Sequence, residues 1–320
     1  MPAPRPDAPA GSRFRTGPAD RGTTLAATLR ARLPDKSWND VRRLCETGKV
    51  SVDGAVAIDP AARLTGEVDI AIDMAARRPR TTTPGFRVAF EDAHLIVIEK
   101  PAGIASVPYE RRDSGTALDL VRTHWREDGR RATTRPLFTV HRLDKETSGL
   151  LCFAITKRAE RGLHEIFQKH LARRHYLAIA HGAVIAGKIE SRLVADRGDG
   201  IRGSARRPRP DEGQLAVTHV EVIEWLVGAT LCRVRLETGR THQIRIHLAE
   251  SGHPVLGDPV YTRDLWRAEG RPISSERLML HAATLGFEHP VTGERLDFVA
   301  EPPAALTAMV ERLRKGARGA

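Results

Sequence analysis

Cysteine is scarce in this sequence. Only Cys45, Cys152 and Cys232 occur among 320 residues, far apart and each in an apolar context. An odd number at such spacing fits neither a disulfide framework nor a cysteine-rich metal site. We therefore expect three buried free thiols, which are typical of a protein in the reducing cytoplasm.

Long apolar runs are also missing. No stretch approaches the roughly 18 consecutive apolar residues that a membrane span requires. The N-terminus is rich in proline and arginine and lacks the apolar stretch of a secretory signal. The sequence shows no repeat of about 20 to 50 residues, which argues against a solenoid. We expect a soluble cytoplasmic protein that does not contact a membrane.

Patterns for metals and cofactors are weak. His242 and His247 do not have the i, i+4 spacing that places two ligands on one helical face, and no acidic or cysteine residue is spaced to join them. Residues 141–144, His-Arg-Leu-Asp, are similar to a kinase catalytic loop, but no Gly-rich phosphate loop precedes them and no Asp-Phe-Gly follows. We expect no metal and no cofactor, and phosphoryl transfer is disfavoured.

Basic residues outnumber acidic ones. The sequence has 51 Lys and Arg against 40 Asp and Glu, a formal net charge of +11. Such an excess favours a polyanionic partner, because neutralising phosphates releases condensed counterions. Charge alone does not distinguish among RNA, DNA and a membrane surface.

The length predicts about two domains, at roughly 150 residues per domain. Residues 1–20 have almost no large apolar side chains, and we expect a disordered tail there. Residues 76–88 have the Pro, Gly and Thr content of a linker. A small domain at 21–75 precedes the linker. A large domain at 89–305 follows it, and a C-terminal helix with a basic tail occupies 306–320.

The small domain is predicted to contain two helices and a hairpin. Thr23 and Thr24 are suitable N-terminal caps for the first helix. The second helix follows Asp35, and Trp38 is expected on its apolar face. The Asp-Gly pair at 53–54 lies between two alternating strands, which is a strong hairpin signal.

The segment from His141 to Gly149 is polar and turn-prone, and apolar runs precede and follow it. This pattern predicts a strand, an exposed loop and a second strand. Asp144 lies in the loop, where its neighbours Arg142 and Lys145 favour the ionised carboxylate. The alternative is a solvated turn with a local ion pair.

This segment also resembles a family motif. Residues 141–149, His-Arg-Leu-Asp-Lys-Glu-Thr-Ser-Gly, resemble the motif that carries the catalytic aspartate of the RluA family of RNA pseudouridine synthases. Lys-Pro-Ala-Gly at 100–103 is similar to the opening motif of that family. Thr-Gly-Arg-Thr-His-Gln-Ile-Arg at 238–245, with His-Pro-Val-Leu-Gly-Asp at 253–258, is similar to its third motif. In the small domain, Gly-Lys-Val-Ser-Val-Asp-Gly at 48–54 and the order of helices resemble the S-four-type RNA-binding domain of a ribosomal protein.

The resemblance, together with the strand and helix patterns, implies an α+β fold. We expect a mixed, mainly antiparallel β-sheet catalytic domain flanked by helices, with a small helical-plus-hairpin N-terminal RNA-binding domain. In the third motif, Thr241 is expected to cap a helix that Gly252 closes.

The resemblance also implies roles for individual residues. Asp144 would be the essential carboxylate, acting as a nucleophile or as a base toward the sugar. Arg245 would be its ion-pair partner, with Arg240 as the second choice. Tyr176 would stack near the base or relay a proton. Without the resemblance, Tyr176 would be a core or edge tyrosine that uses its hydroxyl as a polar handle.

RNA contacts are assigned to basic side chains. Arg142 would fill the gap left when the target uridine flips out, and His141 would support the loop more than perform chemistry. The candidates for RNA binding are Arg142, His141, Arg240, Arg30, Arg42, Arg43 and Lys49. Residues 21–75 hold eight basic and eight acidic residues, so an RNA face there depends on local clustering, and a solvated helix surface is the alternative. The arginine-rich stretch 197–209 predicts a flexible loop that grips phosphates, or a solvated insertion.

We therefore predict an RNA pseudouridine synthase that isomerises specific uridines in structured RNA. Large-subunit ribosomal RNA is the favoured target because an N-terminal module of this kind accompanies ribosomal substrates in the family. The alternatives are a transfer-RNA synthase of the same family and a non-catalytic RNA-binding or ribosome-assembly protein. A monomer is the default expectation.

Overall fold

The structure is a computed structural model. The ranges that it describes are 13–57, 60, 62, 64, 66–76, 86–108, 114–127, 135–205, 212–262 and 273–316. Residues 1–12 of the expected tail and 77–85 of the expected linker lie outside these ranges. The chain divides into two compact units, Met1–Thr82 and Thr83–Ala320. Each unit has its own hydrophobic core.

The N-terminal unit places two helices beside a four-stranded antiparallel sheet, and the predicted helices and hairpin are present. Its elements are α1 (Leu25–Arg32), α2 (Trp38–Glu46) and, in sheet order, β1 (Arg13–Arg15), β4 (Asp69–Ile72), β2 (Val50–Val52) and β3 (Ala55–Val56). The hairpin turn has Asp53 at φ 49° and Gly54 at φ 81°, the two positive values that a type I′ turn requires.

Local capping explains where these helices begin. The Thr24 hydroxyl accepts a hydrogen bond from the Ala27 N–H at 3.2 Å, and Ser37 and Asp40 form a reciprocal capping box. The prediction that Trp38 lies on the buried face of α2 is wrong, because its side chain is 51% exposed. Trp38 is the first helical residue, and the buried face of α2 starts further along the helix.

Residues 13–20 are ordered, which corrects the expected disordered tail. Strand β1 pairs with β4, and a short 3-10 helix, η1 (Pro18–Asp20), follows it. Phe14 packs against the core, and the Arg32 guanidinium lies 4.7 Å from the centre of its ring. Arg32 also forms an ion pair with Asp20 at 2.6 Å. Composition did not reveal this order because one aromatic side chain and one ion pair anchor an otherwise polar segment.

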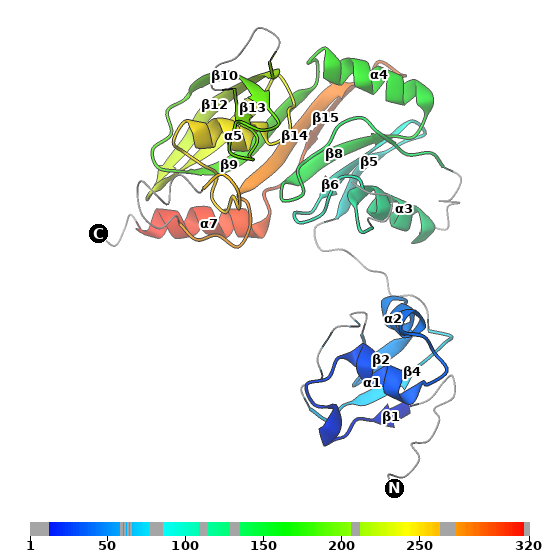
Figure 1. The fold of residues 1–320 in the computed structure, drawn as a ribbon. Helices are drawn as coiled ribbons and strands as arrows, with labels where there is room; N and C mark the ends of the chain where they lie inside the picture. The colour runs from blue at the N-terminus through cyan, green and yellow to red at the C-terminus, as the bar shows by residue number, and fades with distance from the viewer. Residues whose placement is uncertain are drawn as a thin grey trace. The chain divides into compact units, whose positions relative to one another are not determined.

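The C-terminal unit is built on a large, mainly antiparallel sheet (Figure 1). In chain order its strands are β5 (Arg87–Glu91), β6 (Leu95–Lys100), β7 (Phe138–Thr139), β8 (Ser148–Ala154), β9 (Arg173–His181), β10 (Gly187–Val194), β11 (Gly203–Ser204), β12 (Gln214–Leu226), β13 (Ala229–Leu236), β14 (Leu280–Glu288) and β15 (Arg295–Val299). The helices are α3 (Ala117–Glu127), α4 (Lys157–Gln168), α5 (Gln243–Glu250) and α7 (Ala304–Lys315). The predicted α+β class with a mixed, mainly antiparallel sheet is confirmed. Strand β5 begins at Arg87, inside the range expected as a linker.

Among the strand pairs of the described residues, only β8 and β14 are parallel. They contact over the pairs Ser148 with His281 and Gly149 with Ala282. Gly149 has φ 112°, and a Cβ there would lie 2.2 Å from the Ala282 carbonyl oxygen. Only glycine fits this close approach of two backbones. The end of the loop that starts at His141 is thereby fixed beside β14.

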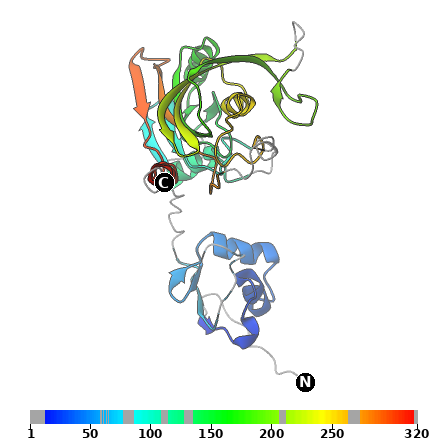
Figure 2. The ribbon, with the colours of Figure 1, turned by 90° about the vertical axis from the view of Figure 1, so that its left-hand side faces the viewer.

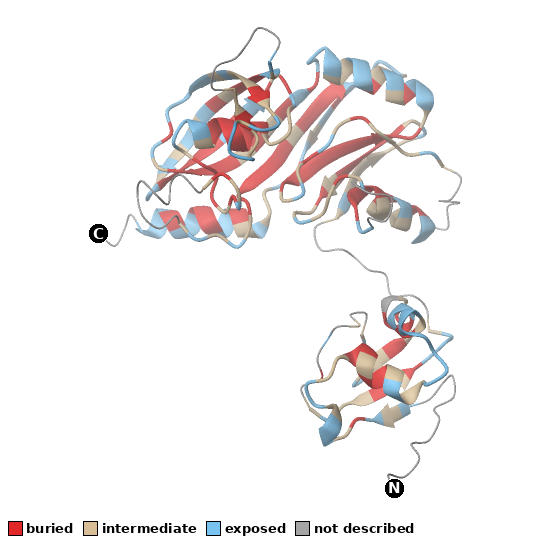
Figure 3. Ribbon diagram, in the orientation of Figure 1, coloured by how far each residue is buried: buried red, intermediate tan, exposed pale blue. Residues whose placement is uncertain are grey.

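The helices enclose a core on both sides of the sheet. Figure 2 shows α5 lying in the curve formed by the strands around β12, and α5 and the central strands are largely buried (Figure 3). Helix α7 packs against the core through four buried side chains, those of Leu306, Met309, Val310 and Leu313. All three cysteines are buried, as predicted, and none of them forms a disulfide within the described residues. None of the helices in the described ranges is long and apolar enough to cross a membrane.

Candidate active site

A pocket of about 430 Å³ opens where the loop from His141 to Thr147 meets β9 and the start of α5. Its walls include Asp144, Tyr176 and Arg245, together with Arg142 and Arg240. Residues that are a hundred positions apart in the sequence therefore share one cavity. The predicted arrangement of strand, loop and strand is present, with β7 before the loop and β8 after it.

The backbone on either side of Asp144 is fixed by hydrogen bonds. The Ser106 hydroxyl donates to the Leu143 carbonyl at 2.8 Å, and the Leu143 N–H donates back to it at 3.0 Å. On the other side, the Lys145 carbonyl accepts from the Gly103 N–H at 2.9 Å and from Lys100 Nζ at 3.1 Å. The Lys-Pro-Ala-Gly segment at 100–103 thus fixes the backbone of the loop that carries Asp144.

Lys100 is a buried cation, 1% exposed. Its Nζ donates to the carbonyls of Pro101 at 2.9 Å and Ile104 at 2.7 Å, in addition to Lys145. Burial lowers the pKa of Lys100 to about 7, while the nearby Glu146 and Asp144 carboxylates act in the opposite direction. Three carbonyl acceptors match the three donors of an ammonium group, so the contacts favour the charged form.

Asp144 faces Arg245. The distance from Asp144 Oδ2 to Arg245 Nη1 is 3.6 Å. Arg240, the second choice, donates instead from Nε to the Leu215 carbonyl at 3.1 Å. The guanidinium closest to the aspartate is therefore that of Arg245.

Asp258 holds Arg245 in this orientation. Its Oδ2 accepts from Arg245 Nε at 2.6 Å and its Oδ1 accepts from Nη2 at 3.0 Å. Burial opposes the charge on Arg245, but Asp258 and Asp144 outweigh it and raise the pKa of Arg245. Oδ1 of Asp258 also accepts the N–H groups of Val260 and Tyr261. Asp258 was quoted in the sequence only as part of a motif, and its role as an anchor becomes visible only in the structure.

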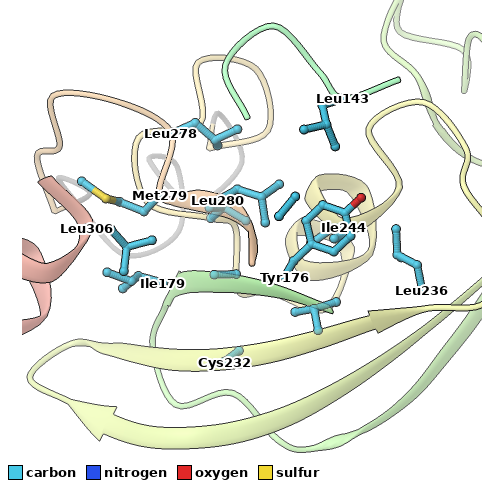
Figure 4. Packing of buried hydrophobic residues seen from close by; sticks show 14 of the residues in the cluster. Leu143, Tyr176, Ile179, Cys232, Leu236, Ile244, Leu278, Met279, Leu280 and Leu306 are labelled. Atoms are coloured by element: carbon cyan, nitrogen blue, oxygen red, sulfur yellow. The ribbon is translucent and has the colours of Figure 1, made fainter. Parts of the chain in front are cut away.

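Tyr176 lies on β9 with 8% of its surface exposed. Its ring belongs to a hydrophobic cluster with Leu143, Leu236 and Ile244 (Figure 4). Burial raises the pKa of Tyr176; the Arg174 charge opposes this rise, and Asp144 adds to it. The hydroxyl therefore remains protonated at neutral pH in a pocket that also holds Asp144.

The start of α5 differs from the prediction. His242, not Thr241, is the N-cap residue; it has φ 59° and makes no capping hydrogen bond with its side chain. The Gln243 side chain fixes the turn before the helix and does not cap it, since its Oε1 accepts from the Arg240 N–H at 3.0 Å and from the Thr238 hydroxyl at 2.8 Å. The threonine signal failed because the left-handed residue reverses the chain just before the helix.

His242 is a pocket residue that sequence reasoning considered only as a metal ligand. Its Nδ1 lies 3.0 Å from the Tyr261 hydroxyl, and the Tyr261 ring lies 5.2 Å from the Arg245 guanidinium carbon. His247 makes different contacts, from Nδ1 to the Thr218 hydroxyl and from Nε2 to the Ser191 hydroxyl. Both imidazoles are thus engaged in contacts within the protein.

His141 supports the loop. Its Nε2 accepts the Cys152 N–H at 3.0 Å, and its ring stacks on Phe167 with 4.4 Å between centroids. Burial, followed by the charge of Arg174, lowers the pKa of His141 to about 3. The ring is therefore neutral at physiological pH. Its neighbour Arg142 is exposed at the rim of the same pocket.

The candidates for RNA binding in the N-terminal unit are engaged to different degrees. Arg30 donates to the Leu33 and Pro34 carbonyls at the end of α1, and Lys49 donates to the Ala76 carbonyl at 2.5 Å. Arg43 forms an exposed ion pair with Asp40 at 3.4 Å, and Arg42 is exposed. Arg42 and Arg43 lie on the solvent side of α2, whereas Arg30 and Lys49 cap backbone carbonyls.

The arginine-rich stretch 197–209 is described as far as residue 205, and residues 206–209 lie outside the described ranges. Arg197 is mostly buried and pairs with Asp199 at 3.1 Å and with Glu250 at 3.7 Å. The ion pair with Glu250 therefore links the loop that contains Arg197 to the end of α5.

Comparisons with known proteins agree on one type of enzyme. Residues 94–250 match a family model described as RNA pseudouridylate synthase. The chain is 35% identical over 306 residues to "Ribosomal large subunit pseudouridine synthase D" of Zymomonas mobilis, covering 91% of this chain and 94% of that protein. It is 34% identical to the protein of the same name from Vibrio parahaemolyticus, covering 92% of each chain.

A solved structure of the same type of enzyme is also similar to this chain. The human protein "RNA Pseudouridylate Synthase Domain Containing 4" is 26% identical and superimposes with a TM-score of 0.56, covering 71% of this chain and 92% of that chain.

Proposed function

The chain belongs to the RluA family of RNA pseudouridine synthases, and from this membership we propose that it converts specific uridines of large-subunit ribosomal RNA to pseudouridine with Asp144 as its essential carboxylate. The position of Asp144 carries the proposal. The carboxylate lies 3.6 Å from Arg245 in a pocket that also contains Tyr176. A surface that only binds RNA has no use for a carboxylate there, because it repels phosphates.

The reaction breaks the bond between N1 of uracil and C1′ of ribose, turns the base, and joins C5 to C1′. C5 loses its proton and N1 gains one, so that the composition of the nucleoside is unchanged. Asp144 acts as the nucleophile on the nucleoside or as the base toward the sugar. Arg245 supplies the positive charge that the carboxylate needs beside RNA phosphates, and Asp258 fixes that charge in place.

Tyr176 supplies the second polar group. Its hydroxyl is protonated and lies in an apolar cluster next to the aspartate. In this position the ring stacks on the flipped uracil, or the hydroxyl relays a proton.

The target base must leave its stack before it reaches the pocket. Arg142 is exposed at the rim, in the same loop that carries Asp144. A planar guanidinium in that place fills the gap left by the uridine, since it can stack on bases and hydrogen-bond to phosphates.

Ribosomal RNA is the proposed substrate because the relatives from Zymomonas mobilis and Vibrio parahaemolyticus are both named for the ribosomal large subunit. The N-terminal unit, in which Arg42 and Arg43 lie on the exposed side of α2, is proposed to add RNA affinity. Mapping pseudouridines in RNA from cells with and without the gene tests the target. Loss confined to transfer RNA would favour the alternative substrate.

Replacing Asp144 with Asn tests the chemistry. We expect Asp144→Asn to abolish the release of tritium from RNA labelled at uracil C5 and to retain affinity for the same RNA. Arg142→Gln is the matched comparison, because it should weaken RNA binding without removing the carboxylate. Equal turnover by the wild-type and Asp144→Asn enzymes would refute a catalytic role, and no turnover by either would favour a non-catalytic RNA-binding protein.

A further inference from the structure

Arg174 is a second buried arginine in the active-site pocket. It lies on β9 two residues before Tyr176, is 8% exposed, and lines the same cavity. Its Nη2 donates to the Glu237 carbonyl at 3.1 Å, and its Nε is buried without a hydrogen-bond partner. Within the described ranges, no carboxylate forms an ion pair with it.

The contacts of Arg174 hold its guanidinium in one place. The group lies 5.6 Å from the centre of the Phe167 ring. On another side is Gly239, where a Cβ would come within 2.7 Å of Arg174 Nη1. The missing side chain of Gly239 is thus what leaves room for the guanidinium.

The two buried arginines differ in their charge balance. Arg245 contacts the carboxylates of Asp258 and Asp144, whereas Arg174 contacts a neutral carbonyl and a ring. Burial lowers the pKa of Arg174, which reflects the cost of keeping this cation away from water. A buried charge is costly unless an opposite charge pairs with it. Arg174 therefore places a buried positive charge on the wall of the pocket without a carboxylate to balance it among the described residues.

The first turn of α5 reinforces this positive potential. Gln243 and Ile244, in this turn, line the pocket beside Gly239. The Gln243 N–H donates to the Arg240 carbonyl at 3.1 Å, and the contribution of this helix end is the helix dipole, which favours a negative charge at the N-terminus. Two separate features of the same wall therefore attract an anion.

We propose that Arg174 and the first turn of α5 form a subsite for one backbone phosphate of the substrate RNA, adjacent to the target nucleoside. The subsite rests on the proposed function, since RNA is the anion that enters this pocket. The fork of an arginine matches two oxygens of a phosphate. Holding that phosphate fixes the ribose relative to Asp144, so Arg174 is a positioning residue for the reaction.

Methylphosphonate substitution tests the subsite on the wild-type enzyme. The probe is a synthetic stem-loop containing the mapped uridine, with one phosphodiester at a time replaced by a neutral methylphosphonate. We expect the affinity to fall about tenfold or more at one position next to the uridine, as for the loss of a charge-assisted hydrogen bond. Equal affinity for all of the substituted RNAs would overturn the proposal.

Arg174→Gln should remove this dependence. The variant should bind the unmodified RNA more weakly, lose the difference between the RNAs, and show a shallower salt dependence of log Kd by about 0.7, the value for one phosphate contact on a single strand. Arg173→Gln is the matched control, because Arg173 is exposed and pairs with Asp297. Arg174→Lys retains the charge and should restore part of the effect if Arg174→Gln is poorly folded.

Binding and turnover are measured on the same RNAs. A phosphate effect that Arg174→Gln abolishes, with no release of the C5 proton, would refute the proposed function and retain the subsite. If the wild type turns over the RNA and methylphosphonate substitution weakens binding equally for the wild type and for Arg174→Gln, the proposed function stands and the subsite is refuted.

Discussion

Asp258 takes two of the three guanidinium nitrogens of Arg245 and leaves the third facing the pocket. The contacts from Nε and Nη2 to the carboxylate are 2.6 and 3.0 Å long, and the remaining Nη1 lies 3.6 Å from Asp144. The Asp258 carboxylate is fully buried. The direction in which Arg245 points is therefore set by a residue that does not itself line the pocket.

Replacing Asp258 with Asn should impair both stability and catalysis. Asparagine keeps an oxygen for the N–H groups of Val260 and Tyr261 but no longer neutralises Arg245. Loss of one partner of a buried pair costs roughly 3 to 5 kcal/mol, and we expect kcat to fall about 100-fold because the guanidinium moves. Chemical denaturation and single-turnover kinetics measure the two effects. Asp297→Asn, in an exposed pair, is the control and should change the stability by no more than about 1 kcal/mol.

Replacing Gly149 with Ala should disrupt the parallel contact between β8 and β14. The new Cβ would clash with the Ala282 carbonyl at 2.2 Å, and the backbone would be strained at φ 112°. Gly198→Ala is a matched control, because Gly198 has φ 103° but no atom within 4 Å of the added Cβ. We expect the control to cost about 1 kcal/mol of unfolding free energy and Gly149→Ala to cost several times more. Equal losses in thermal unfolding would contradict the role of the close approach.

Stability should fall as the pH drops below about 6.5. Burial lowers the pKa of His141 to about 3 and that of His281 to about 4. In this range the unfolded chain binds protons that the folded chain does not, so unfolding becomes more favourable by up to about 1.4 kcal/mol per pH unit for each histidine. The pKa values of His175, His242 and His247 are lowered mainly by burial and act in the same direction.

Replacing His281 with Gln isolates one contribution. His281 Nδ1 lies 2.8 Å from the Ser148 hydroxyl, and its Nε2 lies 3.3 Å from the Ala300 carbonyl. The variant should be less stable at pH 7 but should lose less stability between pH 6.5 and 5 than the wild type. Denaturant unfolding at several pH values measures the slope, and an unchanged slope would show that the imidazole is not kept neutral.

Deleting residues 1–75 should separate binding from chemistry. The C-terminal unit has hydrophobic clusters of its own, built from described residues that lie after position 85, so that unit should fold without residues 1–75. We expect weaker binding to, or altered site choice on, long ribosomal fragments, with turnover on a short stem-loop partly retained. Loss of all turnover in a variant whose circular dichroism shows a folded domain would contradict this division of labour.

Much of this protein can be derived from its sequence, because the signals are local. The Asp53-Gly54 pair specifies a turn through the backbone freedom of glycine. The apolar runs around residues 141–149 specify a strand on each side of the loop, of which β8 is buried and the short β7 is half-buried. The motif resemblance also gave Arg245 as the first choice and Arg240 as the second choice for the partner of Asp144 before any distance was known. Ordering of residues 13–20 was missed because Phe14 and Asp20 gain their partners only from elements further along the chain.

Tertiary structure decided which charges balance one another. The sequence left Arg240 open as an alternative to Arg245, yet among the described residues it is Arg245 that meets both the Asp258 and Asp144 carboxylates. Burial and partners set the state of each group, and neither is encoded by its immediate neighbours. The sequence thus determined which chemistry the chain carries. The packing of β9, the loop from His141 to Thr147 and α5 decided that Arg245 pairs with the Asp144 carboxylate and that Arg174 is available for the proposed phosphate.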